Sequence, residues 1–261
     1  NGPQVGFILL RSEISSEQIH SVPLDSVGAD TQGAIGYMLQ QNLYNEFLRR
    51  GIDKKCCTVI TQCVVDKDDP GFLKPTKPIG PVYTKEDAMN KKESENWDIV
   101  EIANKGWRRV VASPLPLRII EMESIRELIK SGFIVIAVGG GGIPVVQDEQ
   151  GMLKGTAAVI DKDLASSLLA GDISVDLFLI STDIDNVYIN YGKPDQTALE
   201  NITLAEAEKY LEAGEFAPGS MGPKVKSAIN YLKNGGKKVI ITSANNIGKA
   251  IRGETGTHIS G

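Results

Sequence analysis

The sequence predicts an α/β protein: a three-layer α/β/α sandwich around an open, mainly parallel sheet, with a small protruding subdomain. Short unbroken apolar segments such as FIVIAV and VIITS alternate along the chain with amphipathic segments that end near glycine. Strands of a parallel sheet are unbroken apolar runs because helices cover both faces of such a sheet. A long polar, proline-rich stretch interrupts the alternation once, and the 261 residues suffice for one large domain or two lobes.

The individual elements follow from the spacing of apolar residues. Apolar positions at helical spacing, closed by Gly51, predict a first long helix. Helices are predicted over residues 25–51, 122–132, 161–171, 203–214, 223–236 and 245–253. Strands are predicted over residues 55–65, 133–138, 175–182 and 237–244. The opening residues 1–13 combine a Gly-Pro pair with a short apolar run, and we expect a loop there.

Residues 66–113 form the stretch that breaks the alternation. They are rich in Pro, Lys, Asp and Glu, and most connections in compact domains are far shorter. Because PVYT and DIVEIA could form short strands, we expect an ordered protrusion. A solvated insertion without chemistry is the alternative.

Composition excludes several classes of function. The net charge of −5, from 28 basic and 33 acidic residues, argues against a nucleic-acid or anionic-membrane surface. Cys56, Cys57 and Cys63 with His20 and His258 make a poor set of metal ligands, so we expect buried thiols in a reducing cytoplasm. No apolar run reaches the roughly 18 residues of a membrane span, and no signal peptide opens the sequence. The expected location is therefore cytoplasmic.

Four consecutive glycines, Gly139 to Gly142, follow a predicted buried strand. Without Cβ atoms, the backbone can approach a ligand closely and direct N–H groups at its oxygens. A tight crossing between strands is the structural alternative. The run is not a dinucleotide fingerprint, because no clear helix opens after it.

Two lysines occupy predicted helix starts. Lys162 stands between Asp161 and Asp163, where the carboxylates suit the helix dipole and the lysine opposes it. Lys224 follows the turn FAPGSMGP, in which Gly219 and Gly222 give backbone freedom, although the turn is not a Walker A loop. Both lysines suit a cationic clamp on an anion, with Asp163 orienting the ammonium groups. Simple helix caps and an exposed lysine are the alternatives.

A third candidate follows the predicted strand 175–182. There Thr182, Asp183 and Asp185 could coordinate a metal, hold a ribose or form an Asx turn. Their spacing does not decide between these roles.

Several stretches together resemble the carbamate kinases of the amino acid kinase family. They are NGPQVG, GAIGYMLQQ, PTKPIGPVYT, GWRRVVASPLP, GGGGIPV, AVIDKDLASSLLA, INYGKP and GSMGPKVKSA. The resemblance implies reversible phosphoryl transfer between ATP and carbamate, giving ADP and carbamoyl phosphate with Mg²⁺. It also implies a homodimer, and in many bacteria ATP synthesis at the end of arginine breakdown.

The resemblance implies roles for particular residues. Lys162 and Lys224 correspond to the clamp on the transferring phosphoryl group, Asp163 to the residue that organises them, and Lys77 to a lysine that the protrusion brings over the substrate. The substrate-side contacts are Asn1, Gly2, Gly139, Gly140, Gly141 and Gly142. The nucleotide contacts are Asp183, Tyr191, Gly219, Met221 and Lys224. Mg²⁺ would be held mainly by nucleotide phosphates, with no metal ligand assigned to the protein.

The same resemblance divides the chain into two lobes. Residues 1–150 correspond to an N-terminal lobe for carbamate and dimerisation, and residues 151–261 to a nucleotide-binding lobe. Phosphoryl transfer requires positioning and charge neutralisation, not a nucleophilic Ser, Cys or His. The family begins with a β-α-β segment that this sequence does not contain, so we expect part of its phosphate site to be missing. A related acyl-phosphate-forming kinase and an inactive nucleotide-binding fragment remain alternatives.

Overall fold

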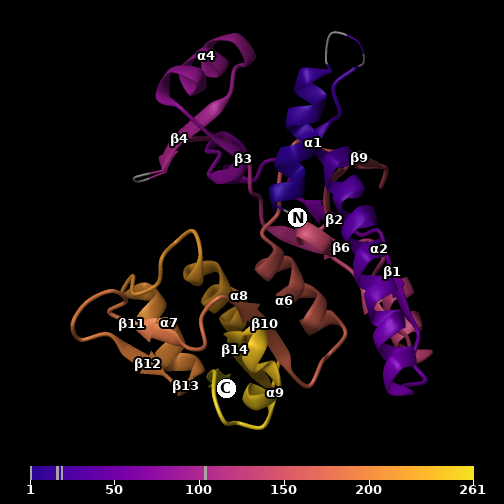
Figure 1. Ribbon diagram of the computed structural model, residues 1–261, viewed down its shortest axis with the longest axis vertical. Helices are drawn as coiled ribbons and strands as arrows, with labels where there is room; N and C mark the ends of the chain where they lie inside the picture. The colour runs from indigo at the N-terminus through magenta and orange to yellow at the C-terminus, as the bar shows by residue number, and fades with distance from the viewer. Residues whose placement is uncertain (1, 16–17, 19, 103–104) are drawn as a thin grey trace. The chain divides into compact units, whose positions relative to one another are not determined.

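A computed structural model describes residues 2–15, 18, 20–102 and 105–261 of the protein. The chain divides into two compact units, Asn1–Ala165 (unit 1) and Ser166–Gly261 (unit 2), which are coloured differently along the chain in Figure 1. The boundary predicted from the sequence lay after residue 150. Each unit combines parallel strand pairs with helices, as the predicted α/β class requires.

Unit 1 contains the glycine run and the strands that precede and follow it in the chain. Its helices are α1 (Gly2–Ile14), α2 (Leu24–Arg50), α3 (Pro70–Leu73), α4 (Lys85–Glu95) and α5 (Met122–Lys130), with a 3₁₀ turn η1 (Gly139–Gly141). Its strands are β1 (Cys56–Thr58), β2 (Gln62–Val65), β3 (Lys77–Tyr83), β4 (Asp98–Ile102), β5 (Gly106–Val111), β6 (Pro116–Ile119), β7 (Ile134–Ile136), β8 (Ile143–Gln147) and β9 (Leu153–Gly155). The strands form the sheets β1-β7, β6-β2-β8-β9 and β3-β5-β4.

Helix α2 confirms the first long helix predicted. It ends at Arg50, and Gly51 adopts the left-handed conformation (φ 63°) with its N–H bonded to the carbonyl of Leu48. Glycine takes this conformation at helix ends without steric cost. One face of α2 is buried, and that face includes the polar residues Thr31 and Gln32.

The single strand predicted over residues 55–65 is wrong, because the chain forms two strands there. β1 pairs in parallel with β7, whereas β2 pairs in parallel with β8. Between them the backbone N–H of Thr61 bonds to the side chain of Gln32 and not to a neighbouring strand. β7 is also less buried than predicted, since Ile134 is 40% exposed.

The loop expected at the start of the chain is wrong as well, because residues 2–14 form α1. Val5 on this helix is buried. Gly6 approaches β3 so closely that a Cβ atom on it would lie 2.8 Å from the Cα of Gly80. The apolar run therefore belongs to a helix that packs on the base of the protrusion.

The protrusion is ordered, as predicted. Strands β3, β5 and β4 form an antiparallel sheet, and α4 lies beside it in the magenta part of Figure 1. Its small core contains Trp97, with the ring of Tyr83 edge-on at 5.6 Å between centroids. The charged ends of Lys91 and Arg109 lie 4.6 and 4.8 Å from the Trp97 ring centroid, a cation–π arrangement.

Unit 2 confirms the predicted strands and helices of the C-terminal part. Helix α6 (Lys162–Asp172) contains the unit boundary, and α7 (Leu204–Glu212), α8 (Met221–Lys233), η2 (Ala244–Asn246) and α9 (Ile247–Ile251) follow. The strands are β10 (Phe178–Thr182), β11 (Val187–Ile189), β12 (Thr197–Leu199), β13 (Asn201–Thr203), β14 (Lys238–Ser243) and β15 (Thr257–Ser260). The four-stranded sheet has the order β10-β14-β15-β13, and β10 and β14 are parallel.

The core of unit 2 holds α8 against this sheet. Val225 and Ala228 of α8 and Val239 and Ile241 of β14 are completely buried in one apolar cluster. Burying a Val or Ile side chain stabilises the folded state by about 1.5–3 kcal/mol. The turn before α8 is thereby tied to the core, which positions the residues at the start of the helix.

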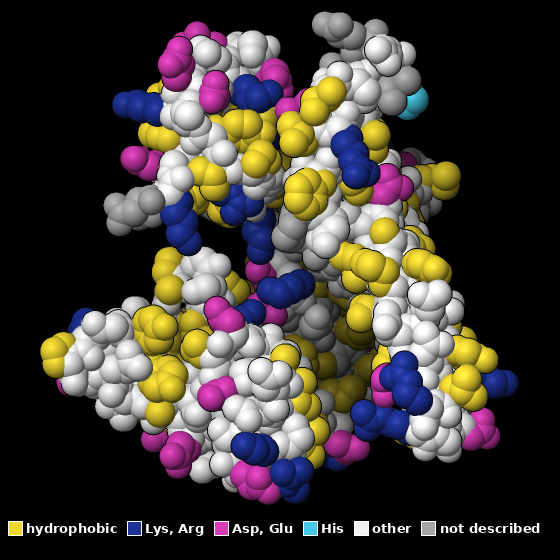
Figure 2. Space-filling view, in the orientation of Figure 1, with side chains coloured by type: hydrophobic (Ala, Val, Ile, Leu, Met, Phe, Trp, Pro, Cys, Tyr) yellow, Lys and Arg dark blue, Asp and Glu magenta, His cyan; other side chains and the backbone are white. Residues whose placement is uncertain are grey.

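The surface agrees with the composition. Figure 2 shows Lys and Arg side chains interspersed with Asp and Glu on the face that it presents. Within the described residues, no helix combines the length and the apolar character that crossing a membrane would require.

Candidate active site

Each unit contains a cavity lined by residues that the sequence singled out. In unit 1, a cavity of about 280 Å³ is lined by Gly139, Gly140, Gly142, Lys77 and Lys162, together with apolar residues; we call it the glycine-loop cavity. In unit 2, a cavity of about 200 Å³ is lined by Asp183, Tyr191, Met221 and Lys224, among others; we call it the tyrosine cavity.

The glycine loop adopts a conformation that few other residues could follow. Val138 and then Gly140, Gly141 and Gly142 have φ values of 55°, 66°, 100° and 90°. The N–H groups of Gly141 and Gly142 bond to the carbonyls of Val138 and Gly139. Within the described part of the chain, no acceptor is found for the N–H groups of Gly139 and Gly140. These two amides are the loop's available donors for a ligand.

The four glycines are required for different reasons. A Cβ atom on Gly141 would lie 2.4 Å from the carbonyl oxygen of Ile160, and one on Gly142 would lie 2.8 Å from the Cβ of Cys63. Tight packing thus accounts for Gly141 and Gly142. Gly139, Gly140 and Gly142 line the cavity, so the two alternatives raised by the sequence both apply, and they overlap at Gly142.

A buried glutamine supports the loop from behind, and sequence reasoning missed it. The Nε2 of Gln32 donates to the carbonyls of Thr61 (3.1 Å) and Gly139 (3.0 Å), while its Oε1 accepts from the N–H of Thr61 (2.7 Å). The hydroxyl of Thr61 accepts from the N–H of Val138 (3.0 Å). A polar side chain on the buried face of the predicted first helix was the available signal, since buried polar groups need partners.

Lys77 reaches the glycine-loop cavity from β3 and is held there by an aspartate. Its Nζ donates to Oδ2 of Asp161 at 2.8 Å. The other oxygen of Asp161 accepts from the N–H groups of Asp163 (2.9 Å) and Leu164 (3.3 Å), as an N-cap does. Burial alone would raise the pKa of the Asp161 carboxyl, but Lys77 and the two N–H groups lower it below its ordinary value. The sequence suggested the cap and gave no indication of the partnership with Lys77.

Lys162 is the first residue of α6, and its ammonium group contacts the neighbouring carboxylate. Its Nζ lies 3.1 Å from Oδ2 of Asp163. The side chain of Lys162 is exposed, whereas Asp163 is buried. A cation at a helix N-terminus opposes the helix dipole, so both Asp163 and any anion in the cavity offset that repulsion.

In unit 2 the tyrosine cavity is built from two short segments. Thr182, Asp183, Tyr188 and Tyr191 come from the chain around β11. The second segment begins at Glu215 and ends at Lys224, a lysine only 8% exposed in the first turns of α8. The rings of Tyr188 and Tyr191 lie 6.1 Å apart.

The two glycines of the α8 turn differ in position. The N–H of Gly222 bonds to the carbonyl of Ala217 at 2.9 Å, and a Cβ atom there would lie 3.1 Å from the same oxygen. Gly219 is exposed, does not line the cavity and would have open space around a Cβ atom. Gly222 therefore shapes the turn, while Gly219 has no packing role in the structure.

Asp183 and Asp185 do not converge on one point. Asp183 lines the cavity and accepts a hydrogen bond from the hydroxyl of Thr182 at 3.0 Å. Asp185 accepts from Nδ2 of Asn246 at 2.8 Å, and hydrogen bonds from Ser243 and Asn246 lower the pKa of its carboxyl. Among the residues that the structure describes, no three His, Cys, Asp or Glu side chains form a potential metal site.

The remaining predicted residues are placed as follows. Gly2 is the first residue of α1, and Asn1 lies outside the described residues. Cys63 is buried, and burial raises the pKa of its thiol to about 12. Cys56 and Cys57 are only partly buried, so the expectation of buried thiols holds for Cys63 alone.

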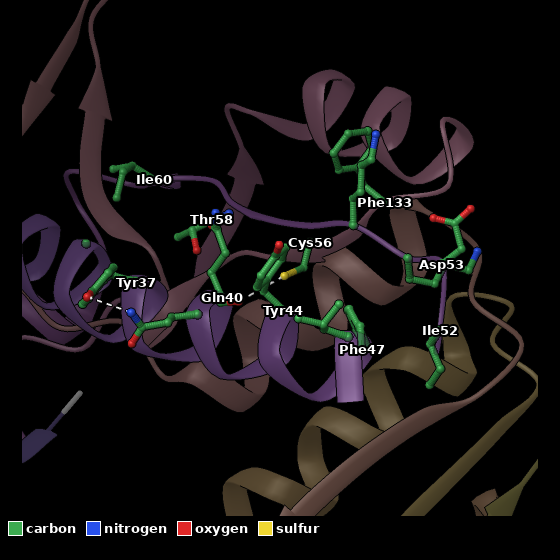
Figure 3. Close-up of a pocket in the computed structure, with 15 residues that line it drawn as sticks. Tyr37, Gln40, Tyr44, Phe47, Ile52, Asp53, Cys56, Thr58, Ile60 and Phe133 are labelled. Carbon is green, nitrogen blue, oxygen red and sulfur yellow. Dashed lines mark hydrogen bonds between the residues drawn. The ribbon is translucent and has the colours of Figure 1, made fainter. Parts of the chain in front are cut away.

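A further hollow of about 840 Å³ runs along α2 and contains none of the predicted site residues. Figure 3 shows Tyr37, Tyr44, Phe47 and Phe133 around it. The thiol of Cys56 faces the carbonyl of Gln40 at 3.5 Å. The hollow is mainly apolar, and Lys54 and Lys55 line it together with Asp53.

Comparison with known proteins identifies the family. The model of the amino acid kinase family matches residues 2–243. The chain is 48% identical to a carbamate kinase of Pyrococcus horikoshii and 51% identical to one of Clostridium perfringens, over 100% and 99% of this chain and 83% of each relative. A structure titled as carbamate kinase from Giardia lamblia bound to AMP-PNP matches with a TM-score of 0.91 and 43% identity, covering 100% of this chain and 82% of that one. The chain therefore belongs to the amino acid kinase family, in the branch that contains the carbamate kinases.

Proposed function

We propose that the protein is a carbamate kinase, an enzyme that transfers a phosphoryl group reversibly between ATP and carbamate. The glycine-loop cavity is the observation that carries this proposal. Two lysines and two available backbone N–H groups border a volume of about 280 Å³, which suits a small anionic acyl phosphate. Family membership and the named relatives support the same reaction.

In unit 1, we assign carbamate and carbamoyl phosphate to the glycine-loop cavity. The N–H groups of Gly139 and Gly140 would donate to substrate oxygens, with Gly2 as a further predicted contact. Lys77 and Lys162 would neutralise negative charge. Donors fixed before the substrate arrives need no reorganisation during the reaction, which favours catalysis.

In unit 2, we assign ATP and ADP to the tyrosine cavity. Tyr191, 65% exposed, offers a ring face for a base, and Met221 adds apolar surface beside it. Asp183 offers a hydrogen-bond acceptor for the nucleotide, and Lys224 a cation for its phosphates.

We also propose that Lys162 and Lys224 supply the cations that phosphoryl transfer requires. Phosphoryl transfer spreads negative charge over the equatorial oxygens, so positioned cations stabilise its transition state. Asp163 would orient the ammonium groups, as its contact with Lys162 suggests. The reaction needs no covalent intermediate on the protein.

Mg²⁺ fits this site as a companion of the nucleotide. The described residues offer no cluster of carboxylates for a cage, and Mg²⁺ commonly binds through substrate phosphates, water and one or two carboxylates. Asp183 and Glu215 both line the tyrosine cavity, and Asp183 could reach such an ion. When bound, Mg²⁺ would neutralise phosphate charge.

We further propose a cytoplasmic homodimer that acts in arginine catabolism, in the direction of ATP synthesis. Exposed apolar side chains on α2, including Tyr37, Met38, Leu39, Tyr44 and Leu48, support a contact between copies in unit 1. Light scattering of the purified protein should give twice the mass of one chain. A monomer at micromolar concentration would contradict this part of the proposal.

The direct test of the activity is ATP formation from ADP and carbamoyl phosphate with Mg²⁺, followed in a coupled luminescence assay. Acetyl phosphate serves as the matched alternative donor. We expect turnover with carbamoyl phosphate and at least about tenfold less with acetyl phosphate, because one substrate-specific hydrogen bond gives discrimination of this size. ADP binding without ATP formation would overturn the proposal, and preference for acetyl phosphate would indicate another acyl-phosphate kinase.

A further inference from the structure

We propose that Asp161 is a positioning residue that fixes the two lysines of the glycine-loop cavity relative to each other. The inference rests on the proposed function for its kinetic test, but the arrangement itself is independent of it. Neither composition nor spacing pointed to this role.

Asp161 connects two elements that are distant in sequence. Its Oδ2 binds Nζ of Lys77 on β3, 84 residues away, at 2.8 Å. Its Oδ1 accepts from the N–H groups of Asp163 and Leu164 at 2.9 and 3.3 Å. One carboxylate thus joins the head of Lys77 to the start of α6, whose first residue is Lys162.

The location of Asp161 favours anchoring over substrate contact. Its side chain is only 13% exposed, and it does not line the cavity, whereas Lys77 and Lys162 do. An ammonium group has three donors, so Lys77 can keep its bond to Asp161 and still offer two to a substrate. Losing the carboxylate would leave Lys77 charged and unanchored.

The protrusion that carries Lys77 has other attachments. α1 packs against β3 where Gly6 meets Gly80, and Lys91 of α4 contacts Glu13 of α1 at 3.1 Å. Removing the Asp161 carboxylate should therefore release the head of Lys77 without releasing the protrusion. The expected defect is one of substrate positioning, with little change in folding.

Asp161→Asn is the informative variant, because asparagine caps a helix as well as aspartate and carries no charge. We expect KM for carbamoyl phosphate to rise about tenfold or more, as for loss of a charged hydrogen bond. KM for ADP should stay within about twofold and Tm within a few degrees. Lys77→Met should show a similar kinetic defect, and the double variant should be no worse than Lys77→Met, since Asp161 acts through Lys77.

Asp176→Asn is the matched control. Asp176 contacts Lys237 at 2.7 Å on the surface of unit 2, and neither residue lines either cavity. This variant should leave both KM values unchanged. Fully additive defects in the double variant, or equal rises in both KM values, would overturn the positioning role.

A second readout separates this inference from the proposed function. Acetylation of Lys77 by a soluble reagent, followed by mass spectrometry, reports how firmly its ammonium group is held, whether or not the protein turns over. We expect faster acetylation of Lys77 in Asp161→Asn and no change in Asp176→Asn. Equal rates for Lys77 in the wild type and Asp161→Asn would overturn the inference, even if ATP is formed.

Discussion

The glycine-loop cavity and the tyrosine cavity are built in different ways. In the first, the buried side chains of Gln32 and Thr61 hold the glycine loop, and the partly buried Asp161 holds Lys77. The second is lined by side chains from two short segments near β11 and the start of α8. The contrast suggests that substitutions in the tightly packed glycine loop and its support at Gln32 will disturb folding and catalysis together, whereas those around the second cavity can be separated from folding.

The largest loss of activity should follow a substitution in the tyrosine cavity. Lys224→Ala should lower the rate of ATP formation about 100- to 1,000-fold, the usual loss when a group that stabilises transition-state charge is removed. Lys226→Ala is the matched control, since Lys226 is exposed two positions along α8. Thermal unfolding should show that both variants fold. If the Lys224→Ala protein retains a tenth of the activity, Lys224 does not stabilise the transition state as proposed.

Glycine substitutions test the difference in construction most sharply. Gly141→Ala should lower the free energy of unfolding by more than about 2 kcal/mol, because it combines a φ of 100° with a Cβ 2.4 Å from the Ile160 oxygen. Gly219→Ala should change it by no more than about 0.5 kcal/mol, because open space surrounds that position. Urea unfolding measures both, and similar losses would contradict the contrast.

Gln32→Glu tests the support behind the glycine loop. The carboxylate would face the carbonyls of Thr61 and Gly139 without the two donor N–H bonds, at a cost of about 1–3 kcal/mol. KM for carbamoyl phosphate should rise, with KM for ADP unchanged. Gln41→Glu, on an exposed part of the same helix, is the control. If Gln32→Glu and Gln41→Glu change KM for carbamoyl phosphate equally, Gln32 has no particular role in supporting the loop.

Thiol labelling gives the smallest and most local signal. Cys63 packs beneath Gly142, and burial raises the pKa of its thiol from 9.0 to about 12. The raised pKa means that the neutral thiol stabilises the fold below pH 9.0, and that this contribution is lost as the pH rises toward about 12. At pH 8, Cys63 should resist a disulfide reagent until unit 1 unfolds, while Cys56 reacts faster. Rapid labelling of all three thiols would show that the loop packing is loose.

Local patterns predicted much of this structure, and pairings over long sequence distances account for what they missed. Gly51 closing α2 and the strands β10 and β14 follow from neighbouring residues, whereas the short strands β11, β12, β13 and β15 were not predicted. The break at Thr61 depends on Gln32, 29 residues away, and the anchor of Lys77 lies 84 residues away. α1 was predicted as a loop because its apolar residues gain a partner only when β3 folds against them. Local motifs identified residues that line the cavities, whereas the pairing of Lys77 with its distant support Asp161 could not be predicted from spacing.

The most direct test of the central claim measures ATP formation over a matrix of ADP and carbamoyl phosphate concentrations. Wild type, Lys77→Met and Tyr191→Ala are compared. The claim that each cavity holds one substrate predicts that Lys77→Met raises KM for carbamoyl phosphate alone and Tyr191→Ala raises KM for ADP alone. If each variant raises both KM values equally, or if the wild-type protein forms no ATP, the division of substrates between the two cavities is contradicted.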